Sequence, residues 1–70
     1  MNISTERFDL ETTFDPTMNQ LIINVYDKLN DRTGSFYEKE VTNIPDKLIE
    51  MKIFIIHNWS HIKNRHLYRL

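Results

Sequence analysis

Residues 45–70 read PDKLIEMKIFIIHNWSHIKNRHLYRL, and this stretch contains the single tryptophan, all three histidines and the densest run of apolar side chains. Pro45 fits the first turn of a helix, because proline has a helical φ and lacks an N–H that would be unpaired there. Asn43 can cap this helix, and Lys63 places positive charge near its carboxyl end. The pattern predicts one long helix from Pro45 to about Leu67, the segment 45–67.

The centre of this segment also fits another structure. Residues 52–57 resemble a buried strand, since a short β-branched run cannot be distinguished from a buried helix by periodicity alone. The helical spacing continues unbroken from Leu48 to Ile62, and this favours the helix.

Apolar residues in this segment form two stripes on a helical projection rather than one. Stripe A consists of Leu48, Met51, Ile55, Trp59 and Ile62, and His66 extends it. Stripe B consists of Ile49, Ile53, Ile56 and Leu67. One stripe is enough to dock a helix on its own domain. The other predicts a surface that binds a second copy of the chain or a different protein.

Trp59 is also a candidate for contact with another protein, because tryptophan is enriched among residues that dominate protein–protein binding energy. The simpler interpretation is that stripe A packs in the core, against an apolar stripe that contains Val25. Stripe B is then the stripe without a partner. The sequence assigns a partner interface or self-interface to Ile49, Ile53, Ile56, Trp59 and Leu67.

A second helix is predicted over residues 15–34. Asp15 can act as the cap and Pro16 as the first helical residue. Gly34 stands where a left-handed residue would end the helix after Thr33. The apolar residues between these ends share one helical stripe: Met18, Leu21, Ile22, Val25 and Leu29.

The two remaining segments have ambiguous patterns. Residues 7–14 alternate apolar and polar side chains, which is a strand pattern, but a single strand is not stable alone, so residues 1–14 are interpreted as an extended arm. Ser35 and Glu38 match a capping box, which predicts a short helix within residues 35–43. The competing interpretation of residues 36–42 is a strand.

These assignments predict an all-α domain. It would contain the N-terminal arm, two long antiparallel helices and a short helix between them. A homodimer through stripe B is expected, since isologous contacts are the commonest oligomer interface.

The chain has 70 residues, no cysteine and a formal net charge of −1. This length predicts one domain, residues 1–70, without disulfides. No apolar run reaches the roughly 18 residues needed to span a bilayer, and the N-terminus lacks the pattern of a secretory signal. A cytoplasmic protein without membrane contact is therefore expected.

Acidic and basic residues are separated along the chain. Residues 1–50 carry all ten acidic residues and five basic ones, whereas residues 51–70 carry four basic residues and no acidic one. The basic end suggests a nucleic-acid-binding helix that uses Lys63, Asn64, Arg65 and Arg69. Four charges are few for this purpose, and the overall balance is acidic. Basic residues also suit the carboxyl end of any helix.

Catalytic equipment is sparse in this sequence. His57 and His61 have the spacing of metal ligands on a helix, but Asn58 stands where a zinc protease has its glutamate, so they are weak candidates. Ser60 can approach His57, yet no oxyanion-hole loop or orienting third group accompanies it. A single glycine also excludes a glycine-rich phosphate loop. No enzyme activity, metal or cofactor is expected.

The function expected by elimination is that of a small protein–protein interaction module. It would bind and modulate, most simply inhibit, a larger host or cellular protein, as small phage- or plasmid-type regulators do. The alternative is a dimeric nucleic-acid-binding regulator that uses the basic C-terminal helix.

Overall fold

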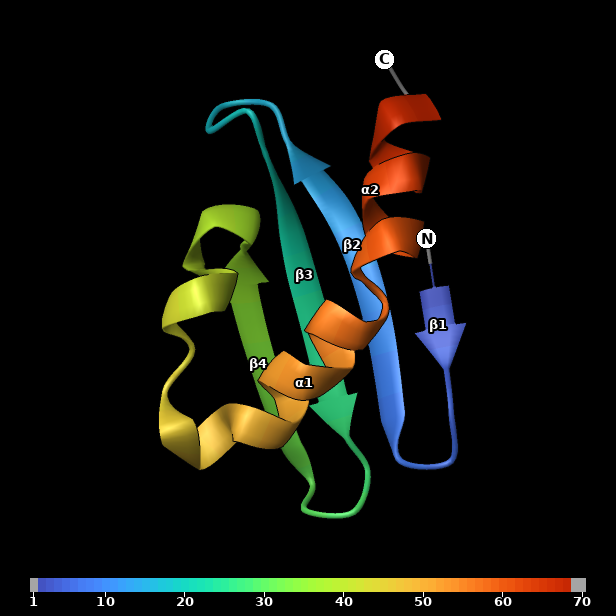
Figure 1. The fold of residues 1–70 in the computed structure, drawn as a ribbon, viewed down its shortest axis with the longest axis vertical. Coiled ribbons are helices and arrows are strands. Elements are labelled where there is room, and N and C mark those ends of the chain that lie inside the picture. The colour runs from blue at the N-terminus through green and yellow to red at the C-terminus, as the bar shows by residue number, and fades with distance from the viewer. Residues whose placement is uncertain (1, 69–70) are drawn as a thin grey trace.

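The computed structural model describes residues 2–68, with side chains described for residues 2–63. Four strands form one antiparallel sheet in the order of the chain (Figure 1): β1 (Asn2–Ser4), β2 (Phe8–Asp15), β3 (Gln20–Asp27) and β4 (Arg32–Tyr37). Two 3₁₀ helices and two α-helices follow: η1 (Glu38–Asn43), η2 (Asp46–Leu48), α1 (Ile49–His57) and α2 (Trp59–Tyr68). The prediction of an all-α domain is therefore wrong.

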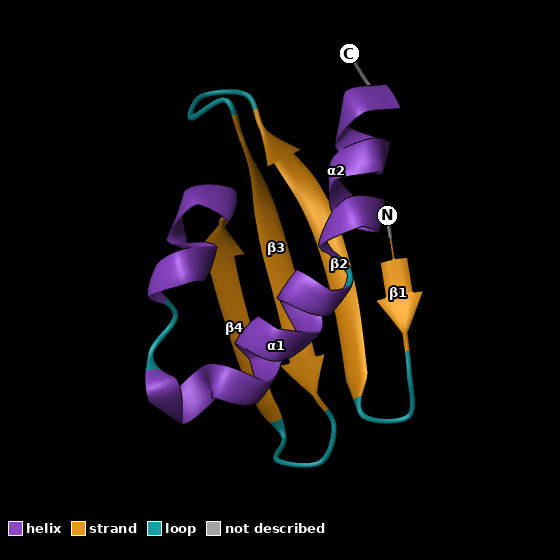
Figure 2. Ribbon diagram, viewed as in Figure 1, coloured by secondary structure: helices purple, strands orange, loops and turns teal. Residues whose placement is uncertain are grey.

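All the helices lie on one side of the sheet, so the protein has two layers (Figure 2). The helix α1 crosses in front of the strands, whereas α2 runs roughly along them (Figure 1). The core lies between the layers. The sheet contributes Phe8, Leu10, Leu21, Ile23 and Val25, and the helical part of the chain contributes Val41, Ile44, Met51, Ile55 and Ile62.

The predicted helix over residues 15–34 is replaced by two hairpins. In β3, Leu21, Ile23 and Val25 are buried while Ile22 and Asn24 point to the other face. This alternation has the period of a strand, and β-branched side chains favour it. Met18 and Leu29, which belong to the apolar stripe of the predicted helix, are exposed in the loops. Pairing with β2 and β4 decides the structure of this segment.

Two four-residue loops explain why the start of this segment resembles a helix. The Asp15 carboxylate accepts hydrogen bonds from the backbone N–H groups of Thr17 (2.9 Å) and Met18 (3.4 Å), as a helix cap does. An aspartate at the start of a turn makes the same bonds. The chain then reverses at Asn19, whose φ is 54°, and the next loop ends likewise at Asp31, whose φ is 50°.

Gly34 does not end a helix, because it is a buried residue of β4 and has no positive φ. Its lack of a side chain makes room where α1 crosses the sheet. A Cβ atom at this position would lie 2.8 Å from the Sδ atom of Met51 and 2.7 Å from the ring of Phe36. Gly34 therefore permits a close approach between the two layers.

The expectations for the two ambiguous segments are also corrected. Phe8–Asp15 is a full strand paired with β3, so the arm predicted over residues 1–14 is wrong. The predicted short helix over residues 35–43 begins later, because Ser35 and Phe36 belong to β4. The 3₁₀ helix η1 starts after Tyr37, whose backbone N–H donates to the Oε1 atom of Glu40 (2.9 Å).

The segment predicted as one helix over residues 45–67 is helical but divided. Pro45 is extended, with φ −59° and ψ 149°, and η2 follows it. Asn58 separates α1 from α2 and has φ −100° and ψ 11°. Its side-chain amide donates to the Phe54 carbonyl oxygen (2.8 Å), a bond that competes with the regular helical pattern. This break lets α1 cross the sheet and α2 follow the strands.

Stripe A faces the sheet in this arrangement. Met51, Ile55 and Ile62 are fully buried, and Leu48 and Trp59 are half-buried against the same core. Trp59 thus has a structural contact, as the simpler interpretation expected. Its stripe packs on a sheet rather than on a second helix, so the predicted pair of antiparallel helices is wrong.

Candidate protein-interaction surface

The outer side of α1 carries apolar side chains that nothing in the described chain covers. Ile49 is 41% exposed, Ile53 is 60% exposed and Ile56 is 52% exposed. They stand at helical spacing on the side of α1 that faces away from the sheet. The side chain of Leu67, the fourth member of stripe B, lies outside the described side chains. We call Ile49, Ile53 and Ile56 the α1 outer face.

A hollow of about 370 Å³ lies beside Ile53. It is lined by Arg7, Phe8, Glu50, Ile53, Phe54 and His57. The rings of Phe8 and Phe54 are stacked with their centroids 4.8 Å apart, and they join the start of β2 to α1. The α1 outer face thus continues into an apolar depression with charged groups at its rim.

Arg7 lines this hollow and links the segments around it. Its Nε and Nη2 atoms donate to the two carboxylate oxygens of Asp27, at 3.2 and 3.1 Å, and it also forms an ion pair with Glu50. The guanidinium lies over the Phe8 ring, with its Cζ atom 4.9 Å from the ring centroid. One side chain therefore connects the β1–β2 loop, the end of β3 and the first turn of α1.

Asp27 is the buried partner in this cluster. Its carboxylate also accepts from the backbone N–H of Leu29 (3.0 Å) and the side-chain amide of Asn30 (2.9 Å). The hydrogen bond from Arg7 is the main reason why the pKa of Asp27 lies well below its ordinary value, and the bonds from Asn30 and Leu29 lower it further. The hydrogen bond to Asp27 likewise raises the pKa of Arg7. Both groups stay charged and hold the loops in place.

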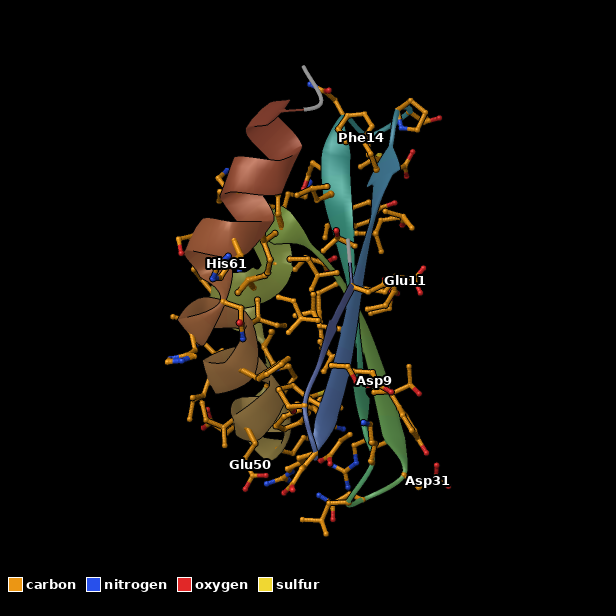
Figure 3. All side chains as sticks on the ribbon, turned by 90° about the vertical axis from the view of Figure 1, so that its right-hand side faces the viewer. Asp9, Glu11, Phe14, Asp31, Glu50 and His61 are labelled. Carbon is orange, nitrogen blue, oxygen red and sulfur yellow. The ribbon has the colours of Figure 1, made fainter. Side chains whose placement is uncertain are left out.

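The weak metal candidates lie on the helical side of the molecule. His57 and His61 are both exposed, and the Asn58 break lies between them. Figure 3 shows His61 on the helical layer of the molecule. Among the described side chains, no three His, Cys, Asp or Glu residues come together as a metal site would require. Ser60 is exposed next to His61.

The residues of the nucleic-acid alternative are described only in part. The Nζ atom of Lys63 pairs with the Glu38 carboxylate at 3.2 Å and lies 5.6 Å from the Trp59 ring centroid. Lys63 thus already has an ion-pair partner within the chain. The side chains of Asn64, Arg65 and Arg69 lie outside the described side chains. Binding of nucleic acid by this end stays a prediction.

Sequence reasoning did not find Arg7, Phe8 or Phe54 as parts of a surface. Phe54 lies between the two stripes, and its contact with Phe8 joins residues that are distant in the chain. The only local signal was the i, i+4, i+7 spacing of the isoleucines. That signal identified the α1 outer face but not the hollow beside it.

No protein-family model, curated protein or solved structure matches this chain. Within the described residues, no helix combines the length and apolar character needed to cross a membrane.

Proposed function

We propose that this protein is a non-enzymatic interaction module that binds a larger protein through the α1 outer face and inhibits it. The observation that carries this proposal is the exposure of Ile49, Ile53 and Ile56 on one side of a single helix. Exposed isoleucines scattered singly need no explanation, but three at helical spacing form a patch typical of an interaction site. In the same proposal, the protein is a cytoplasmic regulator of the phage or plasmid type.

The hollow beside Ile53 supports docking of a protein rather than a flat, non-specific contact. Interfaces derive much of their affinity from a few apolar anchors in fitted depressions. Phe8 and Phe54 make an apolar wall for such an anchor, and the pair between Arg7 and Glu50 gives it a polar rim. An apolar side chain of the partner, packed against the exposed edge of these stacked rings, completes the surface.

The perturbed carboxylates have structural tasks, which supports a role without catalysis. Asp27 binds Arg7 and a loop, Asp15 binds a loop and the Tyr37 hydroxyl, and Asp9 binds Ser4 and Lys28. These bonds lower the pKa of each carboxylate. Shifted pKa values often mark catalytic groups, but structural ion pairs produce them too. Here every one is explained by a loop or strand contact.

When no partner is present, we propose that the α1 outer face of one copy covers that of another in a homodimer. Measurement of the solution mass by light scattering over a range of concentrations tests this. The informative variant is Ile53→Glu/Ile56→Glu, which places two charges on the surface without touching the core. We expect wild-type dimers and a folded monomeric variant. A wild-type monomer at every concentration would show that the homodimer proposal is wrong.

The matched control is Met18→Glu/Leu29→Glu. It also changes two exposed apolar residues to glutamate, but both lie in the hairpin loops, where they are 44% and 72% exposed. In binding measurements with a protein captured from the source cell, we expect the α1 variant to weaken the complex at least about tenfold. The loop variant should bind like the wild type. Equal binding by both variants would contradict the proposed site.

A further inference from the structure

The side of the sheet opposite the helices is a second, chemically different surface. Residues opposite one another in antiparallel strands point to the same face. The strand register therefore makes two cross-strand rows. One row is Ser4, Asp9, Tyr26 and Thr33, and the next is Asn2, Glu11, Asn24 and Ser35. We call these two rows the open face, since no helix of the described chain covers them.

Figure 3 separates the two sides of the molecule. Asp9, Glu11 and Asp31 project from the side of the sheet away from the helices, whereas Glu50 and His61 lie on the helical side. A hollow of about 370 Å³ occupies the open face, and its lining includes both rows from Asn2 and Ser4 across to Tyr26 and Thr33. The sheet thus presents a depression rather than a uniformly flat polar surface.

Most polar groups around this hollow already have partners. The Ser4 hydroxyl donates to Asp9 (2.5 Å), and Lys28 pairs with the same carboxylate (3.1 Å). The Tyr26 hydroxyl donates to Asp31 (2.6 Å), so the Tyr26 ring is held at the rim while remaining 37% exposed. These contacts orient the walls before any partner arrives.

The Glu11 carboxylate is a charged group of this hollow without such a partner among the described residues. This carboxylate has no hydrogen bond or ion pair to any described residue, although Glu11 lies between Asn2 and Asn24 in the second row of the open face. Asp9 lies two residues away on the same strand face, and Asp31 adds a third carboxylate beyond Tyr26. The lysine that contacts this group of carboxylates, Lys28, binds Asp9 and the Thr5 carbonyl oxygen rather than Glu11. Within the described part of the chain, the negative charge of Glu11 in this hollow therefore has no ion-pair partner.

We propose that the open face is a second docking surface, and that its partner is a protein segment that places an arginine side chain in the hollow between Glu11 and Tyr26. The guanidinium donates hydrogen bonds to the Glu11 carboxylate, a charge-assisted contact. Its flat face stacks on the exposed Tyr26 ring, which a compact lysine ammonium does less well. The amide oxygen of Asn2 accepts a remaining N–H. This surface is separate from the α1 outer face and goes beyond the function proposed above.

The test uses a synthetic peptide as the probe, acetyl-Gly-Ser-Arg-Gly-Arg-Ser-Gly-amide, and the same peptide with citrulline in place of arginine. Citrulline keeps the shape of the side chain but is neutral. Titration of ¹⁵N-labelled protein followed by NMR should show saturable shifts at Glu11, Asn24 and Tyr26 with the arginine peptide. The citrulline peptide should give none in the same range. Equal shifts with both peptides would refute the role of the charge.

Glu11→Gln removes the negative charge from the proposed contact but keeps an acceptor oxygen, and it disturbs no pair between described residues, so the variant should fold normally. We expect it to weaken binding of the arginine peptide about fivefold, the effect of one exposed ion pair. Glu6→Gln is the matched control, because Glu6 is an exposed acid in the β1–β2 loop, outside the two rows. It should change binding less than twofold. An equal loss in both variants, or shifts mainly on α1, would mean that the peptide is attracted by net charge and that the open face is not its site.

Discussion

Among single residues, Asp27 is the one whose carboxylate joins the β1–β2 loop to the β3–β4 loop within the described part of the chain. Arg7 from the β1–β2 loop and two residues of the β3–β4 loop, Leu29 and Asn30, donate hydrogen bonds to its carboxylate. An exposed ion pair of ordinary geometry contributes little to stability. This carboxylate is buried and bonded to charged and neutral donors at once, so removing its charge affects both loops.

The first prediction concerns acid unfolding. The folded state lowers the pKa of Asp27 below its usual 3.8, so the unfolded chain binds this proton more tightly. The stabilisation is therefore fully present above about pH 4. It is lost as the pH falls from there toward the folded-state pKa. Asp9 and Asp15 shift in the same direction and add to the effect.

The urea midpoint measured from pH 7 down to pH 2 checks this expectation, and Asp27→Asn provides the comparison. Asparagine retains an oxygen for the loop N–H groups but cannot carry the charge that Arg7 needs. The variant should be less stable than the wild type at pH 7 and should lose less stability on acidification. Parallel pH curves for the two proteins would show that Asp27 is not the group responsible.

Among the elements, the helix α1 has one face in the core and an opposite face that is exposed. Ile55 is completely buried against the sheet, whereas Ile53, two residues earlier, is 60% exposed. Neighbours two apart in a helix point to different sides. The same residue type therefore contributes to the core at one position and to the α1 outer face at the other.

The second prediction compares these two isoleucines. Ile55→Ala should lower the free energy of unfolding by about 2–5 kcal/mol, because it removes buried methyl groups and leaves a cavity. At protein concentrations where the chain is monomeric, Ile53→Ala should change it by less than about 0.5 kcal/mol, as expected for a position that is exposed in the single chain. Urea denaturation of both variants at such a concentration measures the difference. A large loss in Ile53→Ala under these conditions would contradict the exposure of Ile53 in the single chain.

At the scale of the whole molecule, two layers give two unlike outer surfaces. The helical layer presents the apolar α1 outer face, and the other layer presents the carboxylate-rich open face. The core lies between them and separates the two sites. Antiparallel sheets commonly have one solvated face, so the polar character of the open face agrees with the architecture.

The third prediction is that the two surfaces act independently. Effects of substitutions at distant sites without shared partners are usually additive. Ile53→Glu/Ile56→Glu should leave the affinity for the arginine peptide within about twofold of the wild type, and Glu11→Gln should leave the solution mass unchanged. NMR titration and light scattering on the combined variant test this. Coupling between the two measurements would argue that both substitutions act through a shared change in the fold.

The structure could be predicted from the sequence where the interactions that stabilise it are local. Residues 49–57 and 59–68 are helical as their periodicity predicted, and the separation of stripes A and B within α1 follows from helical geometry alone. The hydrogen bonds that the Asp15 carboxylate accepts from the N–H groups after it could also be predicted, because a helix cap and a turn both contain them. Local patterns could not predict whether a helix or a turn follows Asp15.

Tertiary structure alone decided that residues 20–27 form a strand. Leu21 and Val25 fit a helical stripe as well as the buried face of a strand, so the choice depends on hydrogen bonding to β2 and β4. The hollow beside Phe8 and Phe54 and the rows of the open face exist for the same reason. They join residues that are far apart in the chain, and only the folded sheet brings those residues together.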